Sequence, residues 1–487
     1  MVPLYIIIDK MELFEQIVEL VFSGAYWYLT IASIAIVLLE NKNPVRTVAW
    51  VLLLLFIPYF GLLLYIVFGR SFKRQSRLSR KMHAQLTRST NTARSQMAAV
   101  NDSLVSNYQP LIKLLQKTAS TPLSANQDVG IYTDGKTLLN DMLKDIESAK
   151  HHIHAEYYII ESDETGNAFK NALIKKAQEG VKVRLIYDDL GSWHLKRSSI
   201  REMKKAGIRL FSFFKIRFPF FTTKLNYRNH RKIVIIDGKV GYLGGFNIAD
   251  RYTKGLQWGV WRDTHIRVQG NAVINLQNIF RTDWSYMTKK VFKNDAYFPV
   301  STGQNNYFMQ IVGSGPDMDW QTIMQGYLYA IMHAKKYIYI QNPYFLPNES
   351  IANAIQMAAL RGVDVRVMIP FKSDEHIAFE ASISYMGDIL KSGVKILQYQ
   401  KGFIHAKTMV IDGELSIVGT ANMDLRSFEQ NFEVNAFIYN VQKAQELTNI
   451  FTSDSKDCKT LSYWRWKKRP IYRKIVQSMA RLLSPAL

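Results

Sequence analysis

Two long uncharged runs open the chain and predict helices that cross a membrane. The first covers residues 20–39 and the second covers residues 47–69, and neither contains a charged side chain. Each run supplies the ~20 apolar residues that a bilayer-spanning helix requires. Pro58 lies within the second run, where a membrane helix tolerates a proline with a kink. We therefore expect a transmembrane hairpin over residues 1–70, and not the buried core helices of a soluble protein.

Basic residues crowd the segment directly after the second run. The stretch "RSFKRQSRLSRK" begins at Arg70, whereas the short linker between the runs has only Lys42 and Arg46 as basic residues. Because basic flanks stay on the cytoplasmic side, we expect both chain ends in the cytoplasm, as in a multi-pass protein of the cell membrane. Residues 71–127 are polar and predict a basic juxtamembrane helix and linker that lie against anionic headgroups.

The pattern changes at about Asp128 to strand-like apolar segments alternating with amphipathic helices. "AKHHIHAEYYI" predicts a strand, "GNAFKNALIKKAQEG" an amphipathic helix, and "VKVRLIYDD" a second strand. Later, "AKKYIYIQNPYF" echoes the first strand and "ALRGVDVRVMIPF" echoes "AQEGVKVRLIYDD". This duplication predicts an α/β fold of two α/β/α units, over residues 128–300 and 305–455, whose mixed sheets pack face to face around a pseudo-twofold axis.

The charge balance indicates an anionic partner. The 487-residue chain has a formal net charge of +22, and the uncharged runs favour a lipid bilayer over nucleic acid as the partner. "KIRFPFFTTKLNYRNHRK" alternates aromatic and basic residues, which is typical of a surface inserted among headgroups. Residues 456–487 are expected to form an amphipathic, membrane-interfacial tail, although they could equally cover the surface of the α/β units. The single cysteine excludes a disulfide within the chain and a cysteine-based zinc cluster.

One polar motif, H-x-K-x4-D, occurs twice on these apolar strands. The six motif residues, three in each copy and 175 positions apart, are His230, Lys232, Asp237, His405, Lys407 and Asp412. A glycine-containing turn follows each copy and places Asn247 and Asn422 at the same offset. A single motif of this kind is a weak signal, but two copies in register predict a paired site.

The spacing of the motif suits chemistry on a phosphodiester. Side chains at i and i+2 of a strand face the same way, so the histidine and lysine of each copy project together. The lysines and turns would hold phosphate oxygens, and the expected turn residues are Gly245, Asn247, Thr420 and Asn422. One histidine would attack phosphorus while the other protonates the leaving alcohol. We expect no metal or other cofactor, because the lysines supply the positive charge.

The motif aspartates are expected to serve in a different way. Asp237 and Asp412 lie five residues after the lysines and face the opposite side of the strand. We count them with the catalytic motif, but we expect them to fix a turn or pair with a basic group and not to transfer a proton.

The paired motif resembles the phospholipase D superfamily, and the surrounding segments resemble the bacterial cardiolipin synthases. The segments that carry the resemblance include "NYRNHRKIVIIDGKVGYLGGFNIADRY", "WRDTH", "GFIHAKTMVIDG", "VGTANMDLRSFEQNFEVNAFIY" and "NPVRTVAWVLLLLFIPYFGLLLYIVFGR". The resemblance implies that two phosphatidylglycerol molecules become cardiolipin and glycerol through a covalent phosphohistidine. It further implies that His230 is the nucleophile, that His405 is the general acid and then base, and that Asp263 and Glu433 orient the histidines.

Several other functions stay open on the sequence. A hydrolase of anionic phospholipids would share the motif, and phosphatidylethanolamine could replace one of the two phosphatidylglycerol molecules. A nuclease would share the motif too but would need no hairpin. A lipid-binding scaffold without activity is opposed by the intact histidines and lysines of both copies. Neither the oligomeric state nor the acyl-chain preference follows from any pattern.

Overall fold

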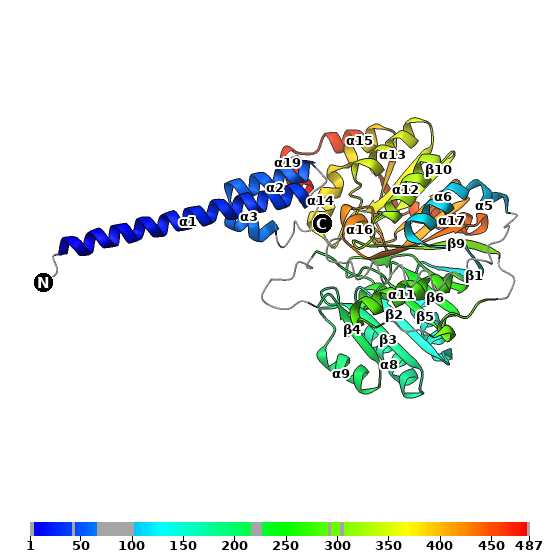
Figure 1. Ribbon diagram of the computed structural model, residues 1–487. Coiled ribbons are helices and arrows are strands. Elements are labelled where there is room, and N and C mark those ends of the chain that lie inside the picture. Colours follow the sequence, from blue (N-terminus) through cyan, green and yellow to red (C-terminus); the bar gives the residue numbers. More distant parts are fainter. Residues whose placement is uncertain are drawn as a thin grey trace. The chain divides into compact units, whose positions relative to one another are not determined.

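The chain folds as two units, which are described separately. A computed structural model describes residues 4–40, 44–65, 102–215, 226–290, 294–301 and 306–484, and Figure 1 draws it as a ribbon. One unit comprises Met1–Gln75 with Ile216–Asn226, and the other comprises Ser76–Lys215 with Tyr227–Leu487. The expected juxtamembrane helix, up to residue 101, and residues 216–225 of the basic aromatic segment lie outside the described residues.

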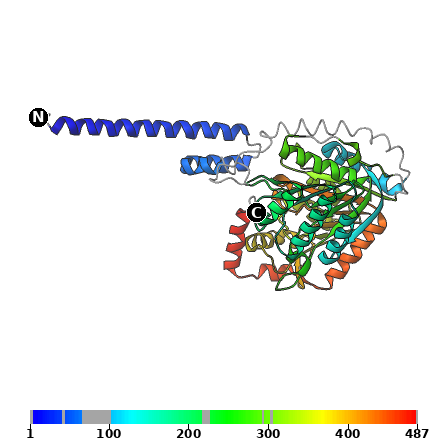
Figure 2. The ribbon, with the colours of Figure 1, turned by 90° about the horizontal axis from the view of Figure 1, so that it is seen from below.

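The first unit begins with one long apolar helix. Helix α1 (Leu4–Glu40) is continuous, as Figure 2 shows, and its portion Phe14–Leu39 has a mean hydropathy of 1.8. By length and composition this portion can cross a membrane. Among the residues that the structure describes, it is the one helix that meets both criteria.

The second uncharged run is broken into two short helices at Pro58, where a kink was expected. Helix α2 (Pro44–Phe56) ends before Ile57, which has φ −139°, and helix α3 (Pro58–Leu64) follows. Proline disfavours helical geometry at the residue before it, which accounts for the break. The rings of Trp50 and Tyr65 lie 5.3 Å apart, so α3 turns back along α2. Tyr65 also joins Val37 of α1 in a small apolar cluster.

The second unit contains a 15-stranded sheet that runs through both halves of the duplication. Its first half is ordered β4-β3-β2-β5-β6-β8-β1, and its second half is ordered β9-β16-β15-β14-β10-β11-β12-β17. Apart from β17, the halves mirror each other strand for strand. They join where β1 pairs with β9 antiparallel, with Ser124 opposite Met309. The repeats are therefore joined side by side through one sheet, and the expected face-to-face packing was wrong.

The strands are short and end at turns. In the first half they are β1 (Ser124–Tyr132), β2 (His152–Tyr157), β3 (Lys182–Asp188), β4 (Arg209–Phe213), β5 (Ile233–Ile236), β6 (Val240–Gly244) and β8 (His265–Gly270). In the second half they are β9 (Tyr307–Ser314), β10 (Tyr337–Gln341), β11 (Asp364–Pro370), β12 (Lys395–Tyr399), β14 (Thr408–Ile411), β15 (Leu415–Gly419), β16 (Glu433–Tyr439) and β17 (Cys458–Leu461). Two further strands, β7 (Val260–Arg262) and β13 (Gly402–Ile404), pair with each other in parallel and link the halves a second time.

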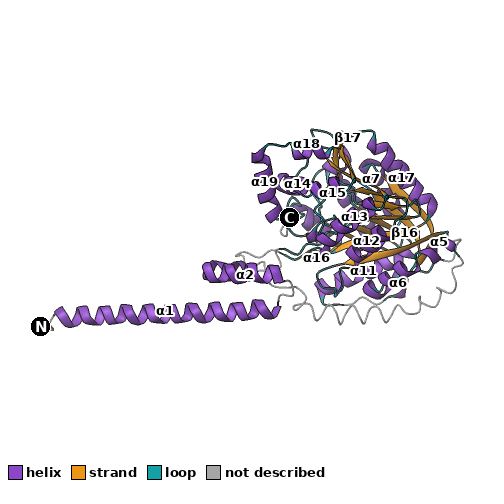
Figure 3. Ribbon diagram, turned by 90° about the horizontal axis from the view of Figure 1, so that it is seen from above, coloured by secondary structure: helices purple, strands orange, loops and turns teal. Residues whose placement is uncertain are grey.

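Helices cover both faces of the sheet, and Figure 3 shows the strands between them. In the first half α11 packs on one face, while α7 and α8 pack on the other. In the second half α17 packs on one face, while α12 and α13 pack on the other. The helices of the sheet layers are α7 (Gly135–Ser148), α8 (Glu164–Gln178), α9 (Arg197–Lys205), α11 (Ala272–Thr288), α12 (Thr322–His333), α13 (Glu349–Leu360) and α17 (Val441–Ser455). The shorter or peripheral helices are α5 (Ser103–Asn107), α6 (Gln109–Ala119), α10 (Asp250–Lys254), η4 (Asp295–Tyr297), α14 (His376–Ser384), α15 (Met386–Lys391), α16 (Leu425–Glu429), α18 (Tyr463–Lys467) and α19 (Ile471–Leu482).

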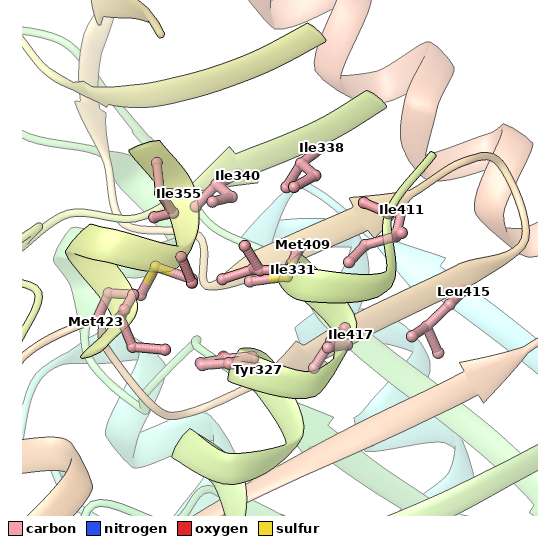
Figure 4. Close-up of a cluster of buried hydrophobic side chains, with 14 of the residues drawn as sticks. Tyr327, Ile331, Ile338, Ile340, Ile355, Met409, Ile411, Leu415, Ile417 and Met423 are labelled. Atoms are coloured by element: carbon pink, nitrogen blue, oxygen red, sulfur yellow. The ribbon is translucent and has the colours of Figure 1, made fainter. Parts of the chain in front are cut away.

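Apolar packing fixes the strands that carry the motif. Figure 4 shows Met409 and Ile411 of β14 among side chains of β10, β15 and α12. In the first half Val234 and Ile236 of β5 are buried in the corresponding cluster beneath α7 and α8. Close-packed cores resist displacement. The packing of β5 and β14 therefore holds the backbone next to each motif histidine in place.

The α/β unit begins earlier than the pattern suggested and retains part of the expected tail. Leu111, Ile112 and Leu115 of α6 are buried in the core of the second half, and β1 starts at Ser124 and not at Asp128. These residues were expected in a polar linker. At the other end, β17 pairs with β12, so residues 458–461 belong to the sheet and not to a tail.

The burial of α6 predicts that its apolar face is required for stability. Replacing Leu115, which is fully buried, by alanine should lower the free energy of unfolding by about 2–5 kcal/mol, because a cavity is left in the core. The matched control is Lys113→Ala on the exposed side of the same helix, which should change it by less than about 0.5 kcal/mol. Urea unfolding of the solubilised full chain measures both, and equal effects would mean that α6 is not part of the core.

Candidate active site

The two motif histidines stand at equivalent places, just before strands β5 and β14. In each copy the lysine ammonium donates to the backbone carbonyl of its own histidine, at 2.7 Å for Lys232 and 2.5 Å for Lys407. Both lysine side chains are buried, at 0% and 1% exposure. An ammonium group has three donors, so each lysine has further N–H groups for an anion.

Each histidine is held by a carboxylate from the other half of the duplication. Nδ1 of His405 lies 2.5 Å from Asp263, which comes from the first half. Nδ1 of His230 lies 3.0 Å from both oxygens of Glu433, which comes from the second half. With a carboxylate at Nδ1, the neutral ring carries its proton on that nitrogen and keeps a lone pair on Nε2. Neither half therefore contains a complete histidine–carboxylate pair.

Backbone hydrogen bonds also connect each histidine to the other half. The N–H of His405 donates to the carbonyl of Arg262 at 2.7 Å, and the N–H of His230 donates to the carbonyl of Phe432 at 2.9 Å. Each accepting residue directly precedes the carboxylate that holds the ring. One short segment therefore fixes both the backbone and the side chain of the opposite histidine.

His230 and His405 line one cavity of about 560 Å³. Its wall differs from one side to the other. Tyr158 packs against His230 with ring centres 5.0 Å apart, whereas Trp261 packs against His405 at 5.1 Å. The charged side chains of the wall are Arg228, Arg251, Asp374, Glu375, Asp424 and Arg426. A cavity of this size, with aromatic walls and a few charged groups, suits an organic ligand.

Burial sets the protonation of the site. It lowers the pKa of His230 to about 4 and that of His405 to about 4, so both rings are neutral at pH 7. Burial also opposes ionisation of Asp263 and Glu433, but the neighbouring histidines and lysines outweigh it and lower the pKa of both carboxyls. The carboxylates are thus charged and the rings are neutral donors to them.

The lysines titrate close to neutrality. Burial lowers the pKa of Lys232 to about 7 although Glu433 opposes the shift, and the nearby charge of Lys407 lowers it further. Burial likewise lowers the pKa of Lys407 to about 8. An anion between the two ammonium groups would reverse these shifts, because it stabilises their charged forms.

The motif aspartates hold a turn away from the cavity. The carboxylate of Asp237 accepts hydrogen bonds from the backbone N–H groups of Lys150, His151 and His152 at 2.8–2.9 Å. Asp412 accepts from Lys335, Lys336 and Tyr337 at 2.7–2.9 Å in the same way. Both aspartates have a left-handed backbone, with φ 51° and 55°. Neither lines the cavity, so a direct part in proton transfer has no geometric support.

The two motif asparagines line the cavity but differ in their bonding. The amide of Asn247 accepts from the N–H of Ile159 at 3.1 Å and donates to the hydroxyl of Tyr252 at 2.7 Å. Among the described residues, the buried side-chain oxygen of Asn422 has no hydrogen-bond donor. This acceptor suits a hydroxyl of a bound substrate, so Asn422 has the stronger geometry for substrate contact.

Gly245 and Thr420 do not line the cavity, although both were expected to contact substrate. They lie beside the carboxylates instead. A Cβ on Gly245 would fall 1.9 Å from an oxygen of Asp263, so only glycine leaves room for that carboxylate. The hydroxyl of Thr420, at the equivalent position, donates to Glu433 at 2.5 Å. Both residues position the groups that hold the histidines.

Several residues of the cavity were not placed there by the sequence analysis, among them Arg228, which was counted with the basic aromatic segment. Arg228 stands two residues before His230, and the second half has Phe403 at that place, so a comparison of the repeats position by position would have found this difference. Tyr344 and Asp374, joined by a 2.6 Å hydrogen bond, come from loops after β10 and β11 that share no motif. Each histidine is paired with a carboxylate from the other half. The sequence shows this only indirectly, because Asp263 and Glu433 follow Asn247 and Asn422 at unequal distances.

Comparison with known proteins agrees with the duplicated architecture. The family described as "Cardiolipin synthase, PLD-like domain" matches residues 142–284 and 327–455, and "Phospholipase_D-nuclease N-terminal" matches residues 29–70. Cardiolipin synthase of Oceanobacillus iheyensis is 43% identical over 475 residues, which cover 95% of this chain and 98% of the relative. Cardiolipin synthase of Listeria monocytogenes serotype 4a is 44% identical over 460 residues, covering 93% and 95%. The crystal structure of phosphatidylserine synthase from Haemophilus influenzae matches in fold, with a TM-score of 0.58, 12% identity, and coverage of 78% of this chain and all of that one.

The depressed lysine pKa values predict how anion binding depends on pH. Affinity for dibutyl phosphate, a phosphodiester whose charge is constant in this range, should fall as the pH rises through 7 and 8, since Lys232 and Lys407 then lose their charge. In Lys407→Arg, where the guanidinium stays charged, the fall should be smaller and should follow Lys232 alone. Calorimetric titration of the solubilised chain measures this, and affinity that is constant from pH 6 to 9 would contradict the assignment.

Proposed function

The chain belongs to the cardiolipin synthase family with phospholipase D-like domains, and we propose that it converts two phosphatidylglycerol molecules into cardiolipin and glycerol. The observation that carries the proposal is the pair of neutral histidines, each held by the other half's carboxylate, on one cavity of about 560 Å³. The reaction is a phosphatidyl transfer through a covalent phosphohistidine.

In the first step one histidine attacks the phosphorus of the donor lipid. A bond forms between Nε2 and phosphorus, the bond from phosphorus to the glycerol oxygen breaks, and the second histidine, protonated for this step, gives its proton to that oxygen. In the second step a hydroxyl of another phosphatidylglycerol gives its proton to the second histidine, and its oxygen bonds to phosphorus. The bond from phosphorus to nitrogen then breaks, which restores the first histidine.

We propose His230 as the nucleophile and His405 as the general acid, as the resemblance of the motif segments implies. Burial lowers the pKa of both rings to about 4, so their pKa values do not rank them. The charged groups around the rings differ, because His230 faces Glu433 with Lys232 and Lys407, whereas His405 faces Lys407 with Asp263 and Asp374. The second carboxylate beside His405 suits the ring that must hold a proton as the general acid.

The lysines and Asn422 supply the groups that stabilise the phosphate. Each buried ammonium has donors beyond its bond to a histidine carbonyl, although neither lysine is among the residues that line the cavity, and the side chain of Asn422 does line it. Negative charge that develops on the phosphate oxygens is stabilised most in such a water-poor site. Asn247, whose amide is already bonded to Ile159 and Tyr252, would contribute less.

A transferase must favour a lipid hydroxyl over water. Tyr158, Tyr252, Trp261 and Tyr344 line the cavity beside the histidines. A lipid that fills this space would leave little room for water, which opposes simple hydrolysis to phosphatidic acid. Phosphatidylethanolamine carries a phosphate of the same kind and is the second candidate donor. We propose lipids and not nucleic acid as the substrates, because the chain carries an apolar helix able to cross a membrane.

We also propose that the chain crosses the cell membrane twice, with the α/β unit in the cytoplasm. Helix α1 supplies the first crossing. The second crossing is assigned to the uncharged run of residues 47–69, and it requires α3 to extend away from α2 at Ile57 in the bilayer instead of folding back along it. Broken helices are tolerated in membranes where neighbours satisfy the freed backbone groups. The basic residues after Arg70 favour the cytoplasmic side.

Trapping the covalent intermediate tests the mechanism. Acid-free quenching of the chain during turnover of phosphatidylglycerol labelled in the phosphate should leave label on His230, located by peptide mapping. His230→Ala should give neither label nor cardiolipin, and His405→Ala should lower cardiolipin formation at least ~1,000-fold, since the leaving glycerol lacks its acid. Label on His405 would reverse the roles of the two histidines. Wild-type rates of cardiolipin formation in both variants would contradict the mechanism.

Labelling of the first linker tests the membrane topology. In a Cys458→Ser background, a Lys42→Cys variant should react in intact cells with a maleimide that cannot cross membranes, because this linker lies outside. A cysteine at Lys144, exposed on α7 of the α/β unit, is the control and should react only after permeabilisation. Protection of the cysteine at 42 in intact cells would mean that the chain does not cross twice.

A further inference from the structure

Helix α19 presents an apolar face to the outside of the α/β unit. Seven side chains form this outward face and are 50–81% exposed, namely Ile471, Tyr472, Ile475, Val476, Met479, Leu482 and Leu483. At 100° per residue they occupy one continuous arc of the helix. A helix on a soluble surface normally turns its apolar stripe inward, so this orientation requires an occupant outside the unit.

The opposite face fixes α19 to the unit in this orientation. Gln477 and Ala480 are buried, and the amide of Gln477 donates to Glu380 of α14 at 2.8 Å. The guanidinium of Arg469 donates to Gln477 at 2.5 Å and lies 3.6 Å above the ring of Trp466. The indole of Trp466 donates in turn to the carbonyl of Ile383 at 2.9 Å. These polar contacts would be lost if the helix rolled its apolar face inward.

The charge of this region matches an anionic surface. Between Ser462 and Ser484 there is no acidic residue, and the basic residues are Arg465, Lys467, Lys468, Arg469, Arg473, Lys474 and Arg481. Trp464 is 67% exposed beside them. An apolar arc flanked by basic residues and an exposed tryptophan is the composition of helices that lie in the headgroup layer of an anionic bilayer.

The same helix packs against the wall of the cavity. Ala480 is buried together with Leu346 and Ala381, and Leu346 lines the cavity. Ala378 of α14 lines the cavity too, while Ile377 beside it is 52% exposed. A surface that lay on α19 would therefore lie next to one wall of the site.

We propose that α18 and α19 dock the α/β unit on an anionic bilayer and hold the cavity wall of Leu346 and α14 at the headgroup layer. Docking lets phosphatidylglycerol pass from the bilayer to the histidines without crossing bulk water. This inference rests on the proposed function, because it assigns the route by which that reaction receives its lipids. The hairpin anchors the chain, and α19 orients the site.

The position of α19 can be measured in the full chain within vesicles. In a Cys458→Ser background, a Met479→Cys variant carrying an environment-sensitive fluorophore should be quenched by spin-labelled lipid in vesicles of phosphatidylcholine with phosphatidylglycerol. Arg473→Cys, on the basic side, is the control and should be quenched by aqueous iodide instead. Equal iodide access at both positions would overturn the proposal. So would shielding at 479 that follows protein concentration and not the lipid quencher, because a second copy would then cover the helix.

An activity test separates this inference from the proposed function. Ile475→Glu together with Met479→Glu should lower cardiolipin formation from phosphatidylglycerol vesicles at least tenfold. Turnover of a short-chain phosphatidylglycerol dissolved as monomers should stay within twofold. Met357→Glu, which puts the same charge on a 58% exposed methionine of α13, should change neither rate. Equal losses on both substrates would overturn the docking role, whereas a wild-type chain that converts neither substrate would overturn the proposed function.

Discussion

The site depends on two buried histidine–carboxylate hydrogen bonds that cross the duplication, from Asp263 to His405 and from Glu433 to His230. All four groups are nine-tenths or more buried, where an isolated charge would be costly. Each carboxylate is tolerable only because a donor from the other half meets it. The β1–β9 pairing and the β7–β13 pairing bring these partners together, so the continuity of the sheet across the halves is a condition of the chemistry.

Burial also explains why the lysines follow the histidines by two residues. An ammonium group bonded to the carbonyl of its own histidine adds positive charge directly behind the ring. That charge adds to burial, which is the larger cause of the lowered pKa of the ring, and it also attracts a phosphate. Burying two lysines has an energetic cost, which is offset when an anion binds and pairs with the ammonium charges. The residues of the unliganded site therefore favour substrate binding at the expense of the stability of the fold.

Much of the fold and of the site could be predicted from the sequence, because the duplication marks both. The two copies of the motif predicted a paired site, and His230 and His405 do line one cavity, while the echoing strands predicted the α/β plan. The features that the sequence did not predict depend on contacts between residues far apart in the chain. Joining of the halves through β1 depends on a strand that follows α6 in a polar region, and the folding back of α3 depends on its side-chain contacts with α2. Gly245 and Thr420 looked like anion-binding turn residues, but their role depends on which carboxylate lies beside them, and local pattern carries no such information.

The crossed carboxylates have a consequence for the origin of the fold. A single repeat would have to assemble as a pair of identical subunits before any histidine met its partner, and every substitution would then appear at two places at once. Fusion into one polypeptide removes that restriction. Arg228 can stand opposite Phe403, and Gly245 opposite Thr420, because each half is free to change alone. Inherited symmetry gives the enzyme its two imidazoles, and covalent linkage lets evolution make them different.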